Sequence, residues 1–285
     1  MSTSTVPCPI CKQPAAFAGT APLKTRGEPV QTQFYRCRAC DFFYRELTEE
    51  SFMENNEVAH YSNLDFADFY RNQRFEYFNL LIDLIQKRMR VGKDDGGERR
   101  PRMLDVGCAY GHLVEVANDR GFDAVGVEIN AGNREHARSN GVTVEDSLDK
   151  FEGEFDVVTI IDALYYVMDP VPFLKEIFER LRPGGFVLAR VTNRNLEARW
   201  RCFRSESADL RIFVDHTSGY SPRAMRRLLR ASGYIDAKVL SESGRAKELS
   251  KKSKRIYRQT GFLAALTFDK IILTPGLYGL GYKPL

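Results

Sequence analysis

The chain has 285 residues, of which 43% are hydrophobic, 28% charged and 12% aromatic, as in typical globular proteins. These values exclude a small disulfide-stapled peptide and a disordered chain. A formal charge of +4, from 42 basic and 38 acidic side chains, is too small by itself to indicate a nucleic-acid partner. No apolar run reaches transmembrane length and the first residues lack a secretory pattern, so we expect a cytoplasmic protein whose cysteines are thiols or metal ligands.

Two C-x-x-C pairs near the N-terminus, Cys8 with Cys11 and Cys37 with Cys40, predict a metal site. Each pair can offer two thiolates from one tight turn, and two such turns together supply the tetrahedral four-sulfur shell that zinc prefers. Because a closed shell leaves no position for substrate, we expect structural Zn²⁺ in a zinc ribbon over residues 1–47. Disulfides and a thioredoxin-like redox pair are the alternatives, and the prolines around the first pair disfavour the helix that a redox pair needs.

Residues 48–100 are expected to connect the ribbon to the main domain. The stretch 62–90 contains neither glycine nor proline and repeats apolar residues near helical spacing, which predicts a long amphipathic helix. The charged, glycine-rich stretch that follows is typical of an exposed linker. We expect this connector to act as part of a lid.

The main domain is predicted to begin with a strand, a glycine loop, a helix and a second strand, over residues 103–106, 107–111, 113–118 and 124–129. Gly107 and Gly111 let a ligand approach backbone N–H groups near a helix N-terminus. Glu128, at the end of the second strand, is placed to accept hydrogen bonds from both hydroxyls of a ribose. The loop lacks the glycine pattern of dinucleotide sites, which disfavours a dehydrogenase.

Further strands are predicted at residues 142–145, 156–161, 186–191, 235–240 and 277–283, with helices between them that include 171–181 and 222–232. The fold class is therefore α/β, a doubly wound, mostly parallel, seven-stranded Rossmann-like sheet over residues 101–285. Two insertions interrupt it, 193–220 where a substrate-shaping loop would lie, and 242–275, which begins basic and continues apolar. The basic half fits a solvated helix face, a nucleic-acid contact or an anchor at an anionic membrane surface.

Four segments resemble, in order, the motifs of the class I S-adenosylmethionine-dependent methyltransferases: LDVGCAYG, VGVEIN, FDVVTIIDALYYVMDP and LRPGGFVLARVTN. The segments YRCRACDFFY and HTSGYSPRAMRRLLRASGY also resemble a bacterial subgroup that joins a four-cysteine zinc ribbon to this domain. The resemblance implies S-adenosylmethionine as the cofactor. The residues expected around it are Tyr61, Asp105, Gly107, Cys108, Gly111, Glu128, Ile129, Asp146, Ser147 and Ile161.

The resemblance also implies a role for each part of this set. Asp105 and the two glycines would shape the pocket for the methionine part, Glu128 would hold the ribose, and Asp146 with Ser147 would lie beside the adenine. Tyr61, at the start of the long helix, is expected either to close over the cofactor or to pack against the domain.

Transfer of a methyl group from a sulfonium needs in-line approach by a nucleophile, and an oxygen or nitrogen acceptor can need a base. The candidate bases are His216, Asp162 and Tyr165, with Tyr166 and His60 as further candidates. We favour His216, which directly follows the aromatic-containing residues 193–215 of the first insertion, and a capping or packing role is its alternative. Family members often carry Glu-His where this chain has two tyrosines. His112 is expected to be part of a pocket wall or of the surface rather than a catalyst. Cys108 is expected to pack in the loop and Cys202 to be a stray thiol, neither acting as a nucleophile.

Three functions are consistent with these residues. The leading one is methyl transfer to a small molecule, such as a sugar-linked or secondary metabolite, with oxygen as the favoured acceptor atom. An RNA base methyltransferase is the second, because basic residues 251–258 could meet phosphates. A non-catalytic cofactor-binding protein that uses its ribbon to bind a partner is the third.

Overall fold

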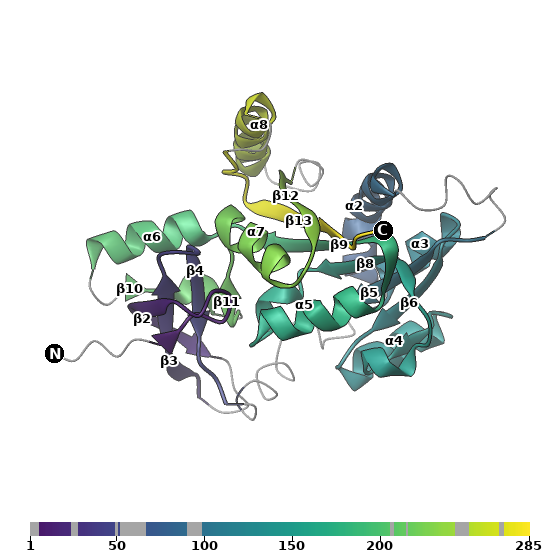
Figure 1. Cartoon of the computed structure of the whole chain (residues 1–285), viewed down its shortest axis with the longest axis horizontal. Coiled ribbons are helices and arrows are strands. Elements are labelled where there is room, and N and C mark those ends of the chain that lie inside the picture. Colours follow the sequence, from purple (N-terminus) through teal and green to yellow (C-terminus); the bar gives the residue numbers. More distant parts are fainter. Residues whose placement is uncertain are drawn as a thin grey trace.

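The computed structural model describes residues 6–23, 28–48, 51, 67–89, 99–205, 208–214, 216–242, 251–267 and 271–285. Within these ranges the strands form two sheets, one of six strands and one of seven. Figure 1 shows the smaller sheet beside one end of the larger one, which carries helices on both faces. The expected α/β fold with a mostly parallel seven-stranded sheet is confirmed.

The N-terminal residues build most of the smaller sheet. Its strands β1 (Val6–Pro7), β2 (Pro14–Leu23), β3 (Val30–Cys37) and β4 (Phe42–Arg45) pair antiparallel in this order. Every residue of β4 is buried, because later parts of the chain cover this strand. The last of these strands, β4, ends at Arg45, within the residues 1–47 that were expected to form the ribbon.

Two short strands from the insertion at 193–220 complete the ribbon sheet. β10 (Ala208–Asp209) runs parallel to β2, and β11 (Ser218–Gly219) runs antiparallel to β4. Gly19 permits the close approach of β10, because a Cβ at this position would lie 2.1 Å from the carbonyl oxygen of Ala208. The insertion expected to shape a substrate site is therefore also a structural part of the ribbon.

The larger sheet has the strand order β12, β13, β9, β8, β5, β6, β7. Its strands are β5 (Arg102–Val106), β6 (Asp123–Val127), β7 (Val144–Glu145), β8 (Phe155–Ile161), β9 (Leu181–Thr192), β12 (Ile235–Ser241) and β13 (Gly276–Tyr282). The neighbouring strands β9, β8, β5, β6 and β7 run parallel to one another, whereas β13 is antiparallel to both of its neighbours. The order reverses between β5 and β8, and ligands of doubly wound sheets bind at such a reversal, outside the carboxyl ends of the strands.

Helices bury apolar stripes on the two faces of this sheet. On one face lie α2 (Ala67–Arg88), α3 (His112–Asp119) and α4 (Ala131–Ser139), and Ile82 of α2 belongs to the same buried cluster as Phe186 and Leu188 of β9. On the other face lie α5 (Pro170–Glu179) and α7 (Pro222–Ala231). The ribbon packs beside α7, where the ring centroids of Phe42 and Tyr220 are 4.9 Å apart.

Two further helices lie in the insertions, α6 (Asn195–Arg204) in the first and α8 (Lys251–Leu266) in the second. The connector helix is described from Ala67, so the start of the predicted helix and the linker at 91–98 lie outside the described residues. β9 begins at Leu181, five residues before the predicted strand, because Leu181 already pairs with Phe155 ahead of an irregularity in the register. No helix in the described ranges is both long and apolar enough to cross a membrane.

Candidate functional site

The glycine loop lies at the carboxyl end of β5, next to the reversal of strand order. Gly107 and Gly111 have φ values of +76° and +79°, which side chains other than glycine rarely adopt. The N–H of Gly107 donates to the carbonyl oxygen of Val127 at 2.8 Å, which fixes the loop against the end of β6. A Cβ on Gly107 would lie 2.5 Å from the Cβ of Ala163, so the loop also touches the residues that follow β8.

Glu128 lies directly after β6 and faces this loop. Its Oε2 accepts the N–H of Ala109 at 2.9 Å, and its Oε1 accepts the N–H of Asn130 at 2.8 Å. Burial raises the pKa of Glu128, whereas the N–H groups of Asn130 and Ala109 favour its ionised form. The carboxylate is therefore held in a fixed position between the loop and the start of α4.

Asp105 and Cys108 support the loop from inside the sheet. Asp105 Oδ1 accepts the hydroxyl of Thr159 on β8 at 2.7 Å, and burial raises the pKa of Asp105 to about 7. Cys108 lies against β6, where a Cβ on Gly126 would be 2.5 Å from its Sγ. Burial also raises the pKa of the Cys108 thiol, which opposes formation of a thiolate nucleophile. Cys108 therefore packs the loop, as the sequence predicted.

The other residues expected at the cofactor lie at neighbouring strand ends. Asp146 and Ser147 follow β7, whose Glu145 pairs with Val127 beside Glu128, and the Ser147 hydroxyl donates to Asp146 at 3.4 Å. Ile129 is 53% exposed and Ile161, the last residue of β8, is half-buried. The structure thus brings the described members of the set to the edge of β5, β6, β7 and β8. Tyr61 and His60 lie outside the described residues.

Asp162 begins a buried group of charges at the end of β8 that the sequence did not indicate. Its φ is +59°, and its carboxylate forms ion pairs with Arg190 of β9 and, at 3.2 Å, with Arg74 of α2. Arg190 also binds Glu242, which follows β12, with N–O distances of 2.7 and 3.1 Å. We call Asp162, Arg190, Glu242 and Arg74 the buried ion cluster.

The buried ion cluster changes what can be expected of Asp162. Burial opposes the positive charge of Arg190, but the carboxylates of Asp162 and Glu242 keep the pKa of Arg190 well above its ordinary value. Both carboxylate oxygens of Asp162 face arginine nitrogens. Its role as a base stays a prediction, and its contacts indicate that it anchors the residues beside the glycine loop. The charged Arg190 within the apolar run FVLARVT was the available signal, because a buried charge needs partners.

His216 and Tyr165 are brought into direct contact. Tyr165 lies in a short 3₁₀ helix, η4 (Leu164–Tyr166), and its ring centroid is 3.8 Å from that of His216, with 24° between the planes. The ring of Tyr166 stands edge-on to His216 at 6.0 Å. Both His216 and Tyr165 are buried. The two candidate bases therefore lie side by side, although they are far apart in the sequence.

The ribbon holds the segment that carries His216. The backbone N–H of Arg45 donates to the carbonyl oxygen of Thr217 at 3.0 Å. The guanidinium of Arg45 donates to the carbonyl oxygen of Phe213 at 2.6 Å. Thr217 in turn donates its N–H and its hydroxyl to the carbonyl oxygen of Tyr165, at 2.9 and 2.8 Å. A continuous set of hydrogen bonds therefore joins β4 to η4.

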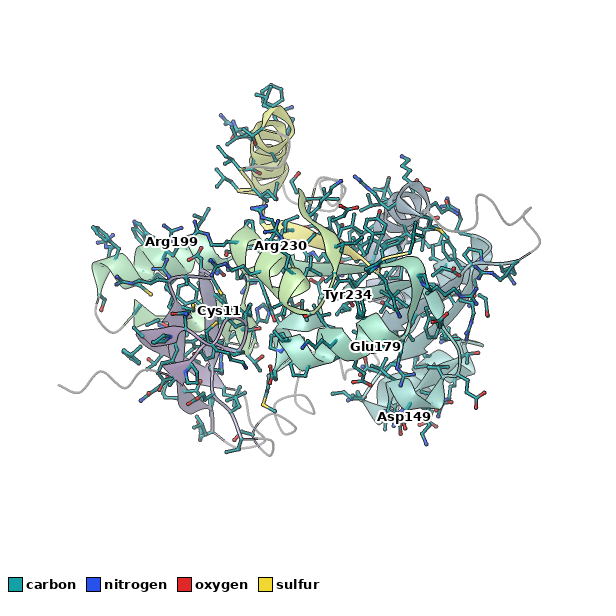
Figure 2. All side chains as sticks on the ribbon, viewed as in Figure 1. Cys11, Asp149, Glu179, Arg199, Arg230 and Tyr234 are labelled. Carbon is teal, nitrogen blue, oxygen red and sulfur yellow. The ribbon has the colours of Figure 1, made fainter. Side chains whose placement is uncertain are left out.

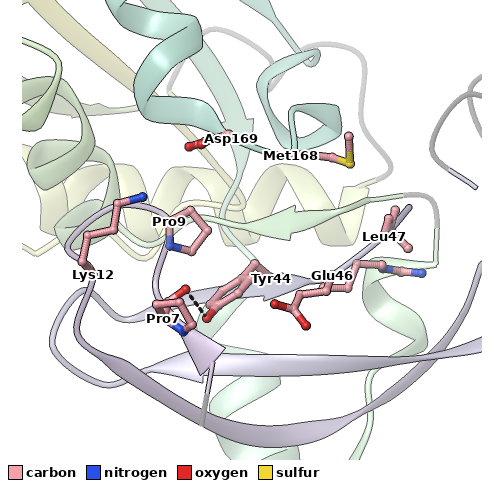
Figure 3. A pocket seen from close by; sticks show the side chains of 9 residues that line it. Pro7, Pro9, Lys12, Tyr44, Glu46, Leu47, Met168 and Asp169 are labelled. Atoms are coloured by element: carbon pink, nitrogen blue, oxygen red, sulfur yellow. Dashed lines mark hydrogen bonds between the residues drawn. The ribbon is translucent and has the colours of Figure 1, made fainter. Parts of the chain in front are cut away.

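A cavity of about 380 Å³ opens at this junction. As Figure 3 shows, Pro7, Pro9, Lys12 and Tyr44 of the ribbon line one side, and Met168 and Asp169, which follow η4, line the other. The hydroxyl of Tyr44 donates to the carbonyl oxygen of Pro7 at 3.0 Å, which holds this wall in place. The cavity lies beside the η4 segment rather than over the glycine loop.

The four N-terminal cysteines converge as the sequence predicted. The Sγ atoms of Cys8, Cys11, Cys37 and Cys40 all lie within 4.8 Å of one another, and Figure 2 marks Cys11. Lys12 and Asp41, which each follow one pair, have φ values of +60° and +56° and close the two turns. Sulfurs at these separations can surround one tetrahedral Zn²⁺, for which Zn–S bonds are about 2.3 Å long.

Two remaining candidates have structural contacts. His112 Nε2–H donates to the carbonyl oxygen of Ala67 at 3.1 Å, which ties α3 to the first residue of α2. Burial lowers the pKa of His112. Cys202 of α6 lies 3.3 Å from the carbonyl oxygen of Ala18 in the ribbon. In these contacts both side chains connect elements of the fold.

The chain is similar to known proteins over the larger sheet. A family model described as "Methyltransferase domain" matches residues 70–238. A ubiquinone biosynthesis O-methyltransferase of Methylococcus capsulatus is 35% identical over 108 residues, which are 34% of this chain and 46% of that protein. The protein of the same name from Pseudomonas aeruginosa is 30% identical over 132 residues, or 42% of this chain and 57% of that one. The chain spans about half the length of the curated relatives it matches.

Two solved structures share the fold. The plantazolicin methyltransferase BamL superimposes with a TM-score of 0.51 at 15% identity, covering 81% of this chain and 91% of that one. The second structure is a chain from the complex between the Haloferax volcanii Trm112 methyltransferase activator and the putative methyltransferase. It superimposes with a TM-score of 0.52 at 18% identity, covering 79% of this chain and 98% of that one. At these identities the likeness concerns the fold alone.

Proposed function

The chain belongs to the methyltransferase-domain family, and on that premise we propose that it transfers a methyl group from S-adenosylmethionine to an oxygen atom of a small molecule. One observation carries the proposal. The glycine loop, with two positive φ values, meets the fixed carboxylate of Glu128 at the reversal of strand order. The names of the curated relatives, which are O-methyltransferases, support the choice of oxygen.

The residues at the sheet edge fit the donor part by part. The loop from Gly107 to Gly111 would receive the methionine part at backbone N–H groups near the start of α3, where partial positive charge favours a carboxylate. Glu128 would accept the ribose hydroxyls, and Asp146 with Ser147 would lie beside the adenine. When bound, the donor supplies an electrophilic methyl on a sulfonium. This chain's own residues bind it, orient the acceptor and receive the acceptor's proton.

Replacing Glu128 with alanine is expected to weaken donor binding by about 1–3 kcal/mol, because the ribose loses its acceptors. Titration calorimetry with S-adenosylmethionine and S-adenosylhomocysteine measures this loss. The matched control is Glu135→Ala, which removes an exposed carboxylate from α4 nearby. Thermal melts of the ligand-free variants separate a binding loss from unfolding. Equal affinity in the Glu128 variant and the control would contradict the proposed donor site.

We propose that the acceptor enters from the cavity at the ribbon junction and that His216 takes its proton. His216 lies one residue from Thr217, which bonds to both β4 and η4, so the ribbon positions the base beside Tyr165. Met168 and Asp169, which line the cavity, closely follow η4, the segment that carries Tyr165. Acid–base groups in such positions contribute about 10²–10⁴-fold to rates.

The variant His216→Phe is expected to keep the ring contact with Tyr165 and to lose about 10²-fold or more in turnover, because no nitrogen accepts the proton. The assay follows a pool of phenols, catechols and glycosides by mass spectrometry for the gain of a methyl group. Donor affinity should match that of the parent protein. His136→Phe, on α4, is the control. An unchanged rate in the His216 variant rules out this base.

We also propose that the four-cysteine cluster binds one structural Zn²⁺. The separations of the four sulfurs fit a tetrahedral shell, and four thiolates leave no open position for substrate. Arg227 of α7 lies 3.7 Å from Cys40 Sγ and would offset part of the negative charge of a four-thiolate zinc site. The metal would thus stabilise the ribbon and its contact with α7.

A further inference from the structure

The outer face of α7 carries a stripe of arginines. Arg223, Arg226, Arg227 and Arg230 are spaced at i, i+3, i+4 and i+7, which places them on one side of the helix. The opposite side buries Met225, Leu228 and their apolar neighbours against the sheet. Three of the four arginines are exposed, and Arg226 is half-buried. We call this set the arginine stripe.

The helix that carries the arginine stripe, α7, has no acidic residue of its own. In the part of the chain that the structure describes, Arg223, Arg226 and Arg230 form no ion pair or side-chain hydrogen bond. Burial lowers the pKa of Arg226, and the like charges of Arg230 and Arg223 lower it further. A stripe whose charges repel one another gains free energy from an anionic partner.

The neighbouring helix α6 exposes an apolar stripe. Leu196, Trp200 and Phe203, at i, i+4 and i+7, are 47%, 58% and 90% exposed. The opposite side of α6 faces the ribbon, where Ala198 is fully buried. Arg199 and Arg204 flank the apolar stripe, and the guanidinium of Arg204 lies over the Trp200 ring at 4.7 Å. The helix thus presents large apolar side chains between cations.

One arginine of the arginine stripe and one arginine that flanks the apolar stripe lie beside the second cysteine pair. Arg199 of α6 lies 3.7 Å from Asp41, and Arg227 of α7 lies 3.7 Å from Cys40, the preceding residue. Figure 2 shows Arg199 and Arg230 on these adjacent helices along one side of the molecule. The two helices that carry the arginine stripe and the apolar stripe are therefore linked through neighbouring residues, Cys40 and Asp41.

We propose that this surface, the arginine stripe of α7 together with Leu196, Trp200 and Phe203 of α6, binds an anionic lipid bilayer. The arginines would lie at the headgroups, and the three apolar side chains would enter the boundary between headgroups and acyl chains. A tryptophan beside an arginine suits this depth, because both have an apolar body and a polar or charged tip.

The apolar residues favour a lipid surface over a nucleic acid. RNA would satisfy the arginines and could stack on Trp200, but it offers nothing to the aliphatic side chain of Leu196. A second copy of the chain would bring the same positive surface to the contact, and the arginines would then repel each other. An anionic bilayer satisfies both the charges and the apolar side chains.

Trp200 allows a direct test, because it is the only tryptophan in the sequence. The full-length protein is mixed with vesicles of phosphatidylcholine alone or of equimolar phosphatidylcholine and phosphatidylglycerol. We expect sedimentation with the anionic vesicles only, together with a shift of tryptophan emission to shorter wavelengths as Trp200 leaves water. Binding should weaken as salt concentration rises.

Paired variants separate the two parts of the surface. Arg223→Gln with Arg230→Gln should reduce partitioning about 30-fold, whereas the control Lys87→Gln with Lys150→Gln removes two exposed cations elsewhere and should change it little. Phe203→Asp should abolish the emission shift, and the control Phe75→Asp, at an exposed phenylalanine of α2, should keep it. These positions are at the surface, so melting curves should match the parent.

Four outcomes would overturn the proposal. They are absence of binding to the anionic vesicles, equal binding to neutral vesicles, equal effects of the variant and control pairs, and binding without any emission shift. Light scattering that shows a dimer broken by Phe203→Asp would assign the surface to self-association instead. Salt-sensitive binding of a mixed-sequence RNA that depends on Arg223 and Arg230, without vesicle binding, would assign it to nucleic acid.

Discussion

Replacing Cys37 with serine is expected to remove the metal and to unfold the ribbon sheet. Structural zinc in small domains contributes about 10 kcal/mol or more of apparent binding free energy near neutral pH, and the ribbon has little core beyond its cysteines and aromatic rings. Elemental analysis should find about one zinc per parent chain and none in the variant. The matched control is Cys202→Ser, because this thiol lies outside the cluster.

The loss of zinc should reach the residues near the proposed base. Because β10 and β11 pair with ribbon strands, hydrogen exchange in residues 208–220 should become much faster in the Cys37 variant. The glycine loop is fixed to β6 and has no contact with the ribbon strands in the described hydrogen bonds, so donor affinity should persist. Full zinc content in the variant, or unchanged exchange at 208–220, would contradict this account.

The variant Arg190→Met is expected to lower the free energy of unfolding by about 3–5 kcal/mol, the second-largest effect. Arg190 is 1% exposed and forms ion pairs with both Asp162 and Glu242, so its loss removes a cation from two buried carboxylates at once. Chemical denaturation measures the change. Arg182→Met, at the half-buried start of the same strand, is the control.

A second variant tests the electrostatic reason. In Arg190→Met with Glu242→Met, one positive and one negative charge leave together, and Asp162 keeps its ion pair with Arg74. We expect this double variant to recover a large part of the lost stability, because removing a whole buried pair is far less harmful than breaking it. A double variant as unstable as the single one would show that packing, rather than charge, makes Arg190 necessary.

The sequence predicted the sheet, and which residues meet at one edge of it, because these signals are local. The strand, glycine loop and Glu128 lie within one short segment, and the strand ends of a parallel sheet meet at one edge. The cysteine pairs were equally clear, because their spacing alone indicates four converging sulfurs. The role of Tyr61 stays a prediction, since it lies outside the described residues.

What the sequence did not reveal depends on contacts between distant residues. Arg74 and Asp162 are 88 positions apart, and Arg190 and Glu242 are 52 apart, so no periodicity connects them. The strands β10 and β11 have two residues each, too few for an alternating pattern. The insertion at 193–220 therefore suggested only a loop near substrate, although it completes the ribbon.

The pairing of the ribbon with β10 and β11 has a consequence for the order of folding on the ribosome. Arg45 bonds to the carbonyl oxygen of Phe213, which lies 168 positions later in the chain. Domains usually fold as units from the N-terminus as they are synthesised. Here the ribbon strands leave the exit tunnel well before β10 and β11, so the outer strands of this sheet can pair only after those later residues have followed. The nascent ribbon sheet therefore stays incomplete until β10 and β11 are synthesised, and a chain released before then would expose unpaired strand edges that can aggregate.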